Sequence, residues 1–168
     1  MRKVGITLVL MIVASVAFGQ LRYVQDMNRI SGGALTSFKG SGFYMQYDRF
    51  LKKGLAVGVN MNYENSLIGH TNYNEIRFST EVKYNLVEWN NMFLNGYFGL
   101  AGEIMNLSSD IESRVENKGL YGNNFGIECE YYLFDLLSLN LKAGQRVYYI
   151  NGNTNFNSLI FGVSYSFY

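Results

Sequence analysis

The residues of this chain that could perform hydrolytic chemistry stand in two polar segments. The only histidine, His70, lies in the first, and Ser108, Ser109 and Asp110 lie in the second. A histidine beside a serine and an aspartate can activate the hydroxyl as a nucleophile, as in hydrolases and acyltransferases. An exposed loop histidine and a Ser-Ser-Asp turn explain the same residues without chemistry. We adopt the second interpretation, so the sequence predicts no catalytic residue and no enzyme.

Metal and cofactor sites are equally poorly supported by the sequence. A single histidine and a single cysteine, Cys129, are too far apart for zinc-ligand spacing. Asp110, Glu112 and Glu116 lack the spacing of a calcium loop, and no glycine loop could hold a phosphate. A net charge of +1 without a basic block gives no reason to expect direct nucleic-acid binding. We therefore predict no metal, no cofactor and no small-molecule substrate.

Charged residues recur with a period of two, which is the pattern of β-strands with two different faces. In YNEIRFSTEVKYNL (73–86), every second residue is polar or charged, and the residues between them are mostly apolar. We expect one structural network of ion pairs from this series: Glu75, Arg77, Glu81, Lys83, Glu103, Glu128, Glu130, Lys142 and Arg146. Within it, Arg146 is predicted to pair with Glu128 or Glu130 on the neighbouring strand.

The whole chain reads as strands separated by turns. It has no proline, which would interrupt hydrogen-bonded ladders, and it is rich in glycine (18), tyrosine (14) and phenylalanine (12). Strand character marks eight segments: 29–37, 42–51, 54–64, 73–86, 92–103, 119–133, 137–150 and 155–167. Tight connections alternate with roomier ones, of which 65–72 and 104–118 are the predicted outer loops. The sequence therefore predicts an all-β, eight-stranded antiparallel up-and-down β-barrel.

The period alone does not say which face of the wall looks inward, because a soluble barrel buries its apolar face and a membrane barrel its polar one. Glycines interrupt the polar series at Gly58, Gly122, Gly126, Gly144 and Gly162, where they would make room in a narrow lumen. The series also carries both charge signs, and aromatic residues gather near strand ends, as at a membrane interface. These features favour an outer-membrane barrel with a plugged, non-conducting interior.

Both ends of the sequence indicate export to an outer membrane. Residues 1–19 have a basic start, an apolar run and small residues before Gln20, which predicts a cleaved signal peptide. Residues 20–168 then form a single β-barrel domain. The final LIFGVSYSFY resembles the C-terminal insertion signal of outer-membrane barrels. We expect localisation in the outer membrane of a Gram-negative bacterium, in contact with its lipid.

Two stretches also resemble the conjugative transposon TraO family of Bacteroidetes-type mobile elements. They are VGVNMNYENSLIGHTNYNEIRFSTEVKYNL and FGIECEYYLFDLLSLNLKAGQRVYY. The resemblance implies a non-catalytic accessory component of a conjugative transfer (mating) apparatus, with other transfer proteins as partners. It carries over no catalytic residue. The alternative is a small OmpA/OmpX-like outer-membrane barrel with a role in adhesion or envelope integrity, unrelated to DNA transfer.

Overall fold

The computed structural model describes residues 25–37, 40–68, 71–109, 114–149 and 154–168; the side chains of 67–68, 71, 107–109, 114–118 and 154–156 are not described. The predicted signal peptide, 1–19, and residues 20–24 of the predicted domain lie outside these ranges. The described residues form the strands β1 (Asn28–Ser37), β2 (Gly40–Lys52), β3 (Leu55–Ile68), β4 (Thr71–Trp89), β5 (Met92–Ser109), β6 (Arg114–Tyr132), β7 (Leu137–Tyr148) and β8 (Thr154–Phe167).

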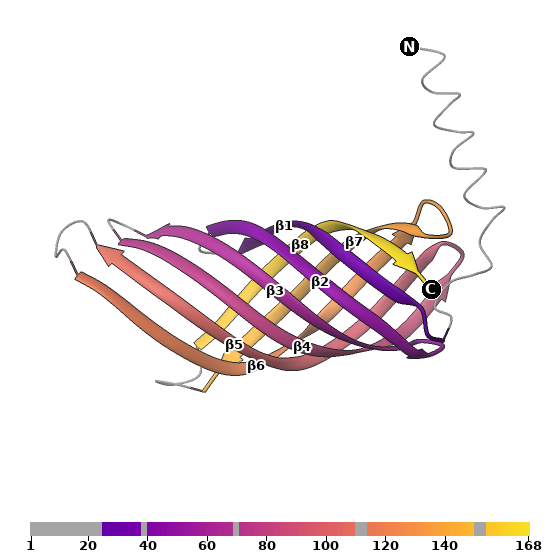
Figure 1. Cartoon of the computed structure of the whole chain (residues 1–168), viewed down its shortest axis with the longest axis horizontal. Helices are drawn as coiled ribbons and strands as arrows, with labels where there is room; N and C mark the ends of the chain where they lie inside the picture. The colour runs from indigo at the N-terminus through magenta and orange to yellow at the C-terminus, as the bar shows by residue number, and fades with distance from the viewer. Residues whose placement is uncertain (1–24, 38–39, 69–70, 110–113, 150–153) are drawn as a thin grey trace, which may run out of the picture.

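Each strand pairs antiparallel with the next, and β1 pairs with β8, so the sheet closes into a barrel (Figure 1). Closure satisfies the backbone groups that would otherwise be exposed at the edges of an open sheet. The predicted eight-stranded antiparallel barrel is therefore confirmed. Among the described residues, no helix is long and apolar enough to cross a membrane.

The connections between strands have similar lengths at the two ends of the barrel. β1 begins and β8 ends at one end, which we call the proximal end (Figure 1). The hairpins β2–β3 and β4–β5 turn there through residues 53–54 and 90–91, where Gly54 and Asn90 adopt positive φ angles of 76° and 51°. The opposite, distal end carries the hairpins β3–β4 and β5–β6. The distal connections span only 38–39, 69–70, 110–113 and 149–153, so the predicted alternation of tight and roomier connections is wrong.

The predicted outer loops are wrong in extent. Of 65–72 and 104–118, all but 69–70 and 110–113 belong to strands, so β4, β5 and β6 reach 19, 18 and 19 residues. These two segments have the polar composition that is typical of loops. A hairpin that projects beyond the bilayer can nevertheless continue its backbone pairing with polar residues. β6 pairs with β7 only from Gly122 onward, so strands β3 to β6 rise beyond β7 and β8 at the distal end. We call this part, together with Asn123 of β6 at its base, the raised wall.

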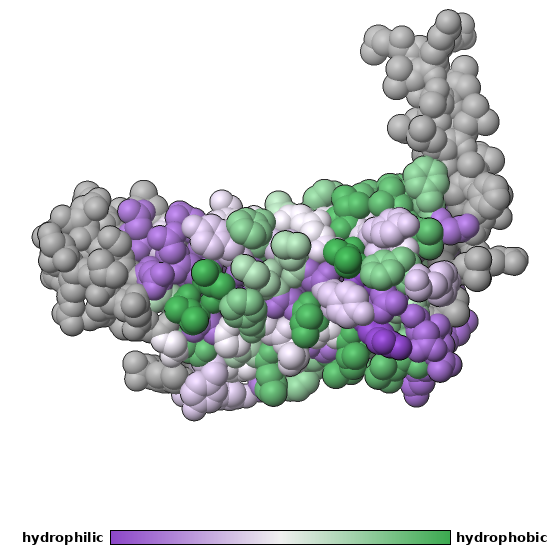
Figure 2. Space-filling model, in the orientation of Figure 1, coloured by the Kyte–Doolittle hydropathy of each residue, from purple (hydrophilic) through white to green (hydrophobic). Residues whose placement is uncertain are grey.

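The wall of the barrel is apolar outside and polar inside. On β4, Phe78 and Val82 are 54% and 51% exposed. Their neighbours in the sequence, Arg77 and Lys83, are only 2% and 3% exposed. Figure 2 shows hydrophobic side chains over the middle of the wall and hydrophilic ones gathered toward the two ends. A soluble barrel would have the opposite arrangement, so the membrane interpretation of the charge pattern is confirmed.

Inward glycines create the space that the lumen side chains occupy. A Cβ added at Gly126 or Gly144 would collide with the hydroxyl of Tyr97, and one added at Gly162 would collide with that of Tyr44. Toward the proximal end, the lumen is filled by a buried apolar cluster: Met27, Phe50, Ala56, Phe93 and Tyr132. The glycines therefore make room in the lumen, but at these three positions for tyrosine rings rather than for the Arg, Lys and Glu side chains expected from the sequence.

A one-residue irregularity changes which side chains face outward on β4. The pairing between β4 and β5 shifts register between Asn85 and Val87. Before it, even-numbered residues such as Tyr84 point outward; after it, Val87 and Trp89 do. A β-bulge of this kind re-aims the side chains that follow it. Trp89, at 70% exposed, consequently lies on the outer surface near the proximal end.

Candidate functional site

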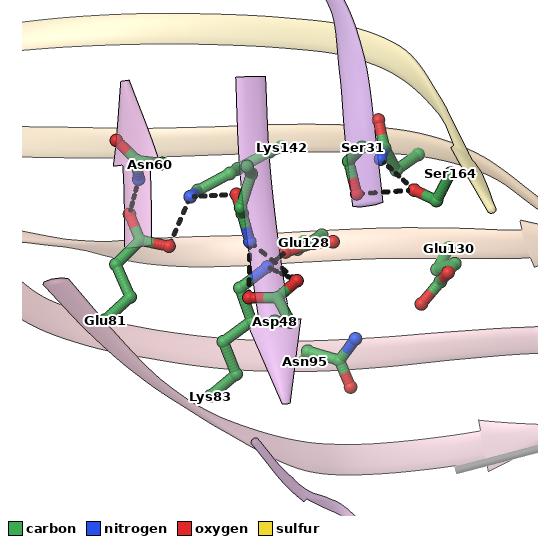
Figure 3. Close-up of polar contacts among 12 residues, drawn as sticks. Ser31, Asp48, Asn60, Glu81, Lys83, Asn95, Glu128, Glu130, Lys142 and Ser164 are labelled. Atoms are coloured by element: carbon green, nitrogen blue, oxygen red, sulfur yellow. Dashed lines mark hydrogen bonds and ion pairs between the residues drawn. The ribbon is translucent and has the colours of Figure 1, made fainter. Parts of the chain in front are cut away.

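The most distinctive chemistry of the molecule is a network of ion pairs inside the barrel. Its first part, the proximal cluster, joins two cations, Arg29 and Lys83, to three carboxylates, Asp48, Glu128 and Glu130. Figure 3 shows Lys83 beside Asp48 and Glu128. Nη2 of Arg29 lies 2.7 Å from Asp48 and 3.2 Å from Glu128, and its Nη1 contacts Glu130. Nζ of Lys83 lies 3.2 Å from Asp48 and also contacts Glu128. All five side chains are at most 3% exposed.

A second group, the distal cluster, repeats this ratio with Arg77 and Arg146 against Glu64, Glu75 and Glu103. Nε of Arg77 lies 2.7 Å from Glu103, and its Nη2 lies 3.1 Å from Glu75 and 3.2 Å from Glu64. Arg146 contacts Glu103 and Glu64 at longer distances, 3.6 and 3.8 Å. Glu64 and Glu75 are direct cross-strand neighbours, so the Arg77 guanidinium compensates two adjacent like charges.

Between the two clusters lies a middle layer with one cation and one carboxylate. Nζ of Lys142 contacts Glu81 at 2.6 Å, and the other carboxylate oxygen accepts hydrogen bonds from Asn60 and Asn124 (Figure 3 shows the contacts of Lys142 and Asn60). Lys142 also stands 4.1 Å from the centroid of the Tyr97 ring. Burial of charge is tolerated when every group is paired in this way.

All nine residues of the predicted network point into the lumen, but the predicted partner of one of them is wrong. Arg146 does not reach Glu128 or Glu130; it contacts Glu64 and Glu103. The β6–β7 register sets Arg146 opposite Asn124, whereas Glu128 is opposite Lys142. Four residues of strand separate the two levels by about 13 Å, beyond the reach of a side chain.

Three members of the network were not predicted: Arg29, Asp48 and Glu64. Each occupies an inward position, and Glu64 ends a visible polar series on β3. Arg29 and Asp48 share their strands with inward Ser, Gln, Tyr and Phe residues, which obscures the charge pattern. If every second residue of β1 and β2 had been read as one face, with Tyr accepted as an inward residue, Arg29 and Asp48 would have been assigned to the lumen.

The lumen holds little free space. A cavity of about 20 Å³ lies between the middle layer and the distal cluster, lined by residues that include Asn62, Arg77, Tyr97 and Asn124. That volume fits about one water molecule, and the buried Oδ1 atoms of Asn62 and Asn124 have no protein partner, so a water could bond to both. In the part of the chain that the structure describes, no group of three His, Cys, Asp or Glu side chains could hold a metal ion.

The hydrolytic residues considered at the start are only partly described. Ser108 and Ser109 end β5, with Asn72 and Thr71 of β4 as their Cα partners. His70 and Asp110 lie outside the described residues, so a catalytic rim stays untested, as does the prediction that the chain is not an enzyme.

The fold of this chain is similar to solved structures of small outer-membrane β-barrels. No family model matches the chain, and no curated protein does. Among solved structures, Ail, the attachment invasion locus protein of Yersinia pestis, matches with a TM-score of 0.63 at 12% identity, over 86% of this chain and 100% of Ail. The outer membrane protein OprG of Pseudomonas aeruginosa matches with a TM-score of 0.68 at 10% identity, over 86% of this chain and 97% of OprG.

A third structure, the N-terminal β-barrel domain of Pseudomonas aeruginosa OprF, matches with a TM-score of 0.64 at 16% identity, over 85% of this chain and 98% of that domain. At these identities the likeness concerns the fold. The chain has the fold of small outer-membrane β-barrels, in agreement with its apolar outer wall.

Proposed function

We propose that the protein is a structural barrel of a Gram-negative outer membrane that acts through its distal raised wall, in adhesion or in envelope integrity, and has no transport or catalytic role. The observation that carries the proposal is the filled lumen. The cations and carboxylates of the network interlock across the barrel, and the cavity described between the middle layer and the distal cluster fits about one water molecule. Opening a path would separate buried ion pairs, at a cost of several kcal/mol for each unpaired charge.

Because the lumen is filled, the function must be carried by the outer surfaces of the barrel. A transmembrane strand needs about 9–11 residues to cross a bilayer. Strands of 18 and 19 residues in β4 to β6 therefore extend well beyond the apolar band, and the raised wall stands in water. Its described outward side chains include amides and tyrosines: Tyr63, Asn65, Asn74, Tyr121 and Asn123.

These side chains already bond one another across strands. Asn74 accepts hydrogen bonds from Tyr63 and Asn65, at 3.2 and 2.7 Å, and Asn123 contacts the hydroxyl of Tyr149. Such contacts give the wall a fixed surface, which suits recognition of a partner. The name of Ail, an attachment invasion locus protein, is in keeping with an adhesion role for a barrel of this fold.

Deletion of the gene tests the proposal. We expect loss of adhesion or increased sensitivity to detergent, restored by the wild-type chain but not by a chain with Tyr121→Ser and Asn123→Ser. The matched control is Lys53→Gln in the proximal β2–β3 turn, which should restore fully. Stepwise conductance of the purified barrel in planar bilayers, or full restoration by the raised-wall variant, would contradict the proposal.

A second candidate function rests on the resemblance to the TraO family: an accessory component of a conjugative transfer apparatus, with other transfer proteins bound at the raised wall or at the proximal end. The two quoted stretches of sequence support it. Its test is mating frequency. A fall on deletion, with adhesion and detergent sensitivity unchanged, favours this candidate, whereas unchanged mating removes it.

A further inference from the structure

A groove crosses the outer, lipid-facing side of the wall over strands β2 to β5. It consists of two adjoining hollows of about 540 and 420 Å³. Tyr47 and Val59 line both hollows and therefore join them. Apolar side chains form most of the remaining lining: Val57, Val82, Phe98 and Leu100 in the first hollow, and Ile30, Met45, Met61 and Phe78 in the second. We call this the lipid groove.

One cation stands at the proximal part of the lipid groove. Arg49 lines the first hollow, and it lies three residues before the end of β2 in an outward row whose neighbours are Tyr47 and Leu51. Its Nη2 lies 3.3 Å from Oδ1 of Asp26, and the two side chains are 54% and 68% exposed. An exposed pair of this kind contributes little stability, so the guanidinium is available to another anion.

We propose that the lipid groove and Arg49 form a binding site for one glycerophospholipid of the periplasmic leaflet, with its phosphate on the Arg49 guanidinium and its two acyl chains in the two hollows. The assignment of the leaflet rests on the proposed membrane location, with the raised wall on the extracellular side, where such barrels extend furthest. Arg49 lies close to the opposite, proximal end, at the depth where phosphates are found. The hollows lie beside it on the apolar band.

The chemistry of the site selects an amphiphile with an anionic head. Apolar walls with a single guanidinium at one end match two hydrocarbon chains and a phosphate, which accepts paired hydrogen bonds from arginine. A second copy of the chain docked over the groove would instead have to bury Arg49 against an apolar wall. Burial of an unpaired charge is costly, so the lipid is the better occupant.

The test uses the full barrel, purified in detergent and mixed with phosphatidylglycerol or with diacylglycerol that carries the same acyl chains. Native mass spectrometry should detect one retained phosphatidylglycerol and little diacylglycerol. Arg49→Gln should weaken retention of phosphatidylglycerol about tenfold, since it removes a charged hydrogen bond, while Arg49→Lys should retain part of it. Each variant is first checked for folding by its heat-modifiable gel mobility.

The hollows are tested separately. Thr80 lines the first hollow on the outer face, so Thr80→Trp should fill it and weaken retention, and the milder Thr80→Leu should do so to a smaller extent. Leu141→Trp on the outer face of β7, outside the groove, is the matched control and should leave retention unchanged.

Three results would overturn the site: equal retention of both lipids, unchanged retention by Arg49→Gln, or a dimer in place of the lipid adduct. The first two would show an unspecific annular lipid only. The raised-wall variant Tyr121→Ser/Asn123→Ser should retain the lipid, so failure of the lipid site and failure of the proposed function remain distinguishable.

Discussion

The proximal and distal clusters hold the same set of charges, two cations against three carboxylates, yet they are built differently. In the proximal cluster, Arg29 touches all three carboxylates and Lys83 touches two of them. Of the described ion pairs in the distal cluster, Arg77 makes the shorter ones, and Arg146 stands farther from Glu64 and Glu103. Their surroundings also differ: a buried apolar cluster closes the lumen below the proximal cluster, whereas the side chains that line the small cavity beside the distal one are mostly polar.

Two clusters with the same numbers of cations and carboxylates are therefore expected to differ in how well they tolerate the loss of a cation. The proximal cluster borders buried apolar side chains, so loss of either cation would leave buried carboxylates without a counter-charge and each cation is needed. In the distal cluster, which lies next to the small internal cavity, Arg146 has room to adjust. We infer that the proximal cluster fixes the barrel, whereas the distal cluster tolerates change near the raised wall.

The largest effect is expected from Arg29→Met. It leaves three carboxylates with Lys83 alone, and removal of one partner from a buried ion pair costs about 3–5 kcal/mol. Urea unfolding in lipid vesicles, followed by heat-modifiable gel mobility, measures the loss. Lys53→Met, at an exposed turn position, is the control and should change the free energy of unfolding by less than about 0.5 kcal/mol.

Arg77→Met is expected to cost less than Arg29→Met in the same experiment, at the lower end of about 3–5 kcal/mol. Arg146 remains beside Glu64 and Glu103 and can move toward them. An equal or larger loss than that of Arg29→Met would contradict the proposed difference between the clusters.

A smaller effect, about 1–2 kcal/mol, is expected from Arg146→Met, because Arg77 keeps the close contacts to both carboxylates. The double variant Arg77→Met/Arg146→Met should lose more than the sum of the two single variants, since each cation compensates for the other. Additive losses would show that the two arginines act independently.

The smallest effect is expected in the middle layer, where one cation meets one carboxylate. Lys142→Met combined with Glu81→Gln removes both charges, and paired removal of a buried ion pair is often close to neutral, within about 1 kcal/mol. Lys142→Met alone should cost more than the pair of changes. A double-mutant cycle by urea unfolding gives both values, and a costly double variant would show that the layer needs its charges.

The sequence predicted the fold because the barrel depends on a local pattern. A period of two in 73–86 places Arg77 and Phe78 on opposite faces whatever the neighbouring strand is, and the glycines and mixed charges of the polar face then favour the lumen for Arg77. The ends of β3 to β6 were missed because residues such as Asn65 and Ser108 have the composition of loops. Above the bilayer, however, two strands can pair through their backbones whatever their side chains are. The residue types therefore do not show where the pairing ends.

The partners of the charges were harder to predict than their positions. Which groups meet across the lumen depends on the stagger between strands, which no single strand encodes. Arg146 is one strand from Glu128 in sequence order but contacts Glu64, from β3. Arg29 and Asp48 were missed because each is the only charge on its inward row.

The β-bulge at Asn85–Val87 has a consequence for how the protein sits in its membrane. By reversing the parity of β4 for its last residues, it directs the indole of Trp89 outward at the proximal rim. Tryptophan side chains prefer the headgroup region of a bilayer. A single additional residue thus sets how deeply the barrel sits: insertion of one residue between Val87 and Glu88 would turn the indole toward the lumen and remove this anchor from the headgroup region.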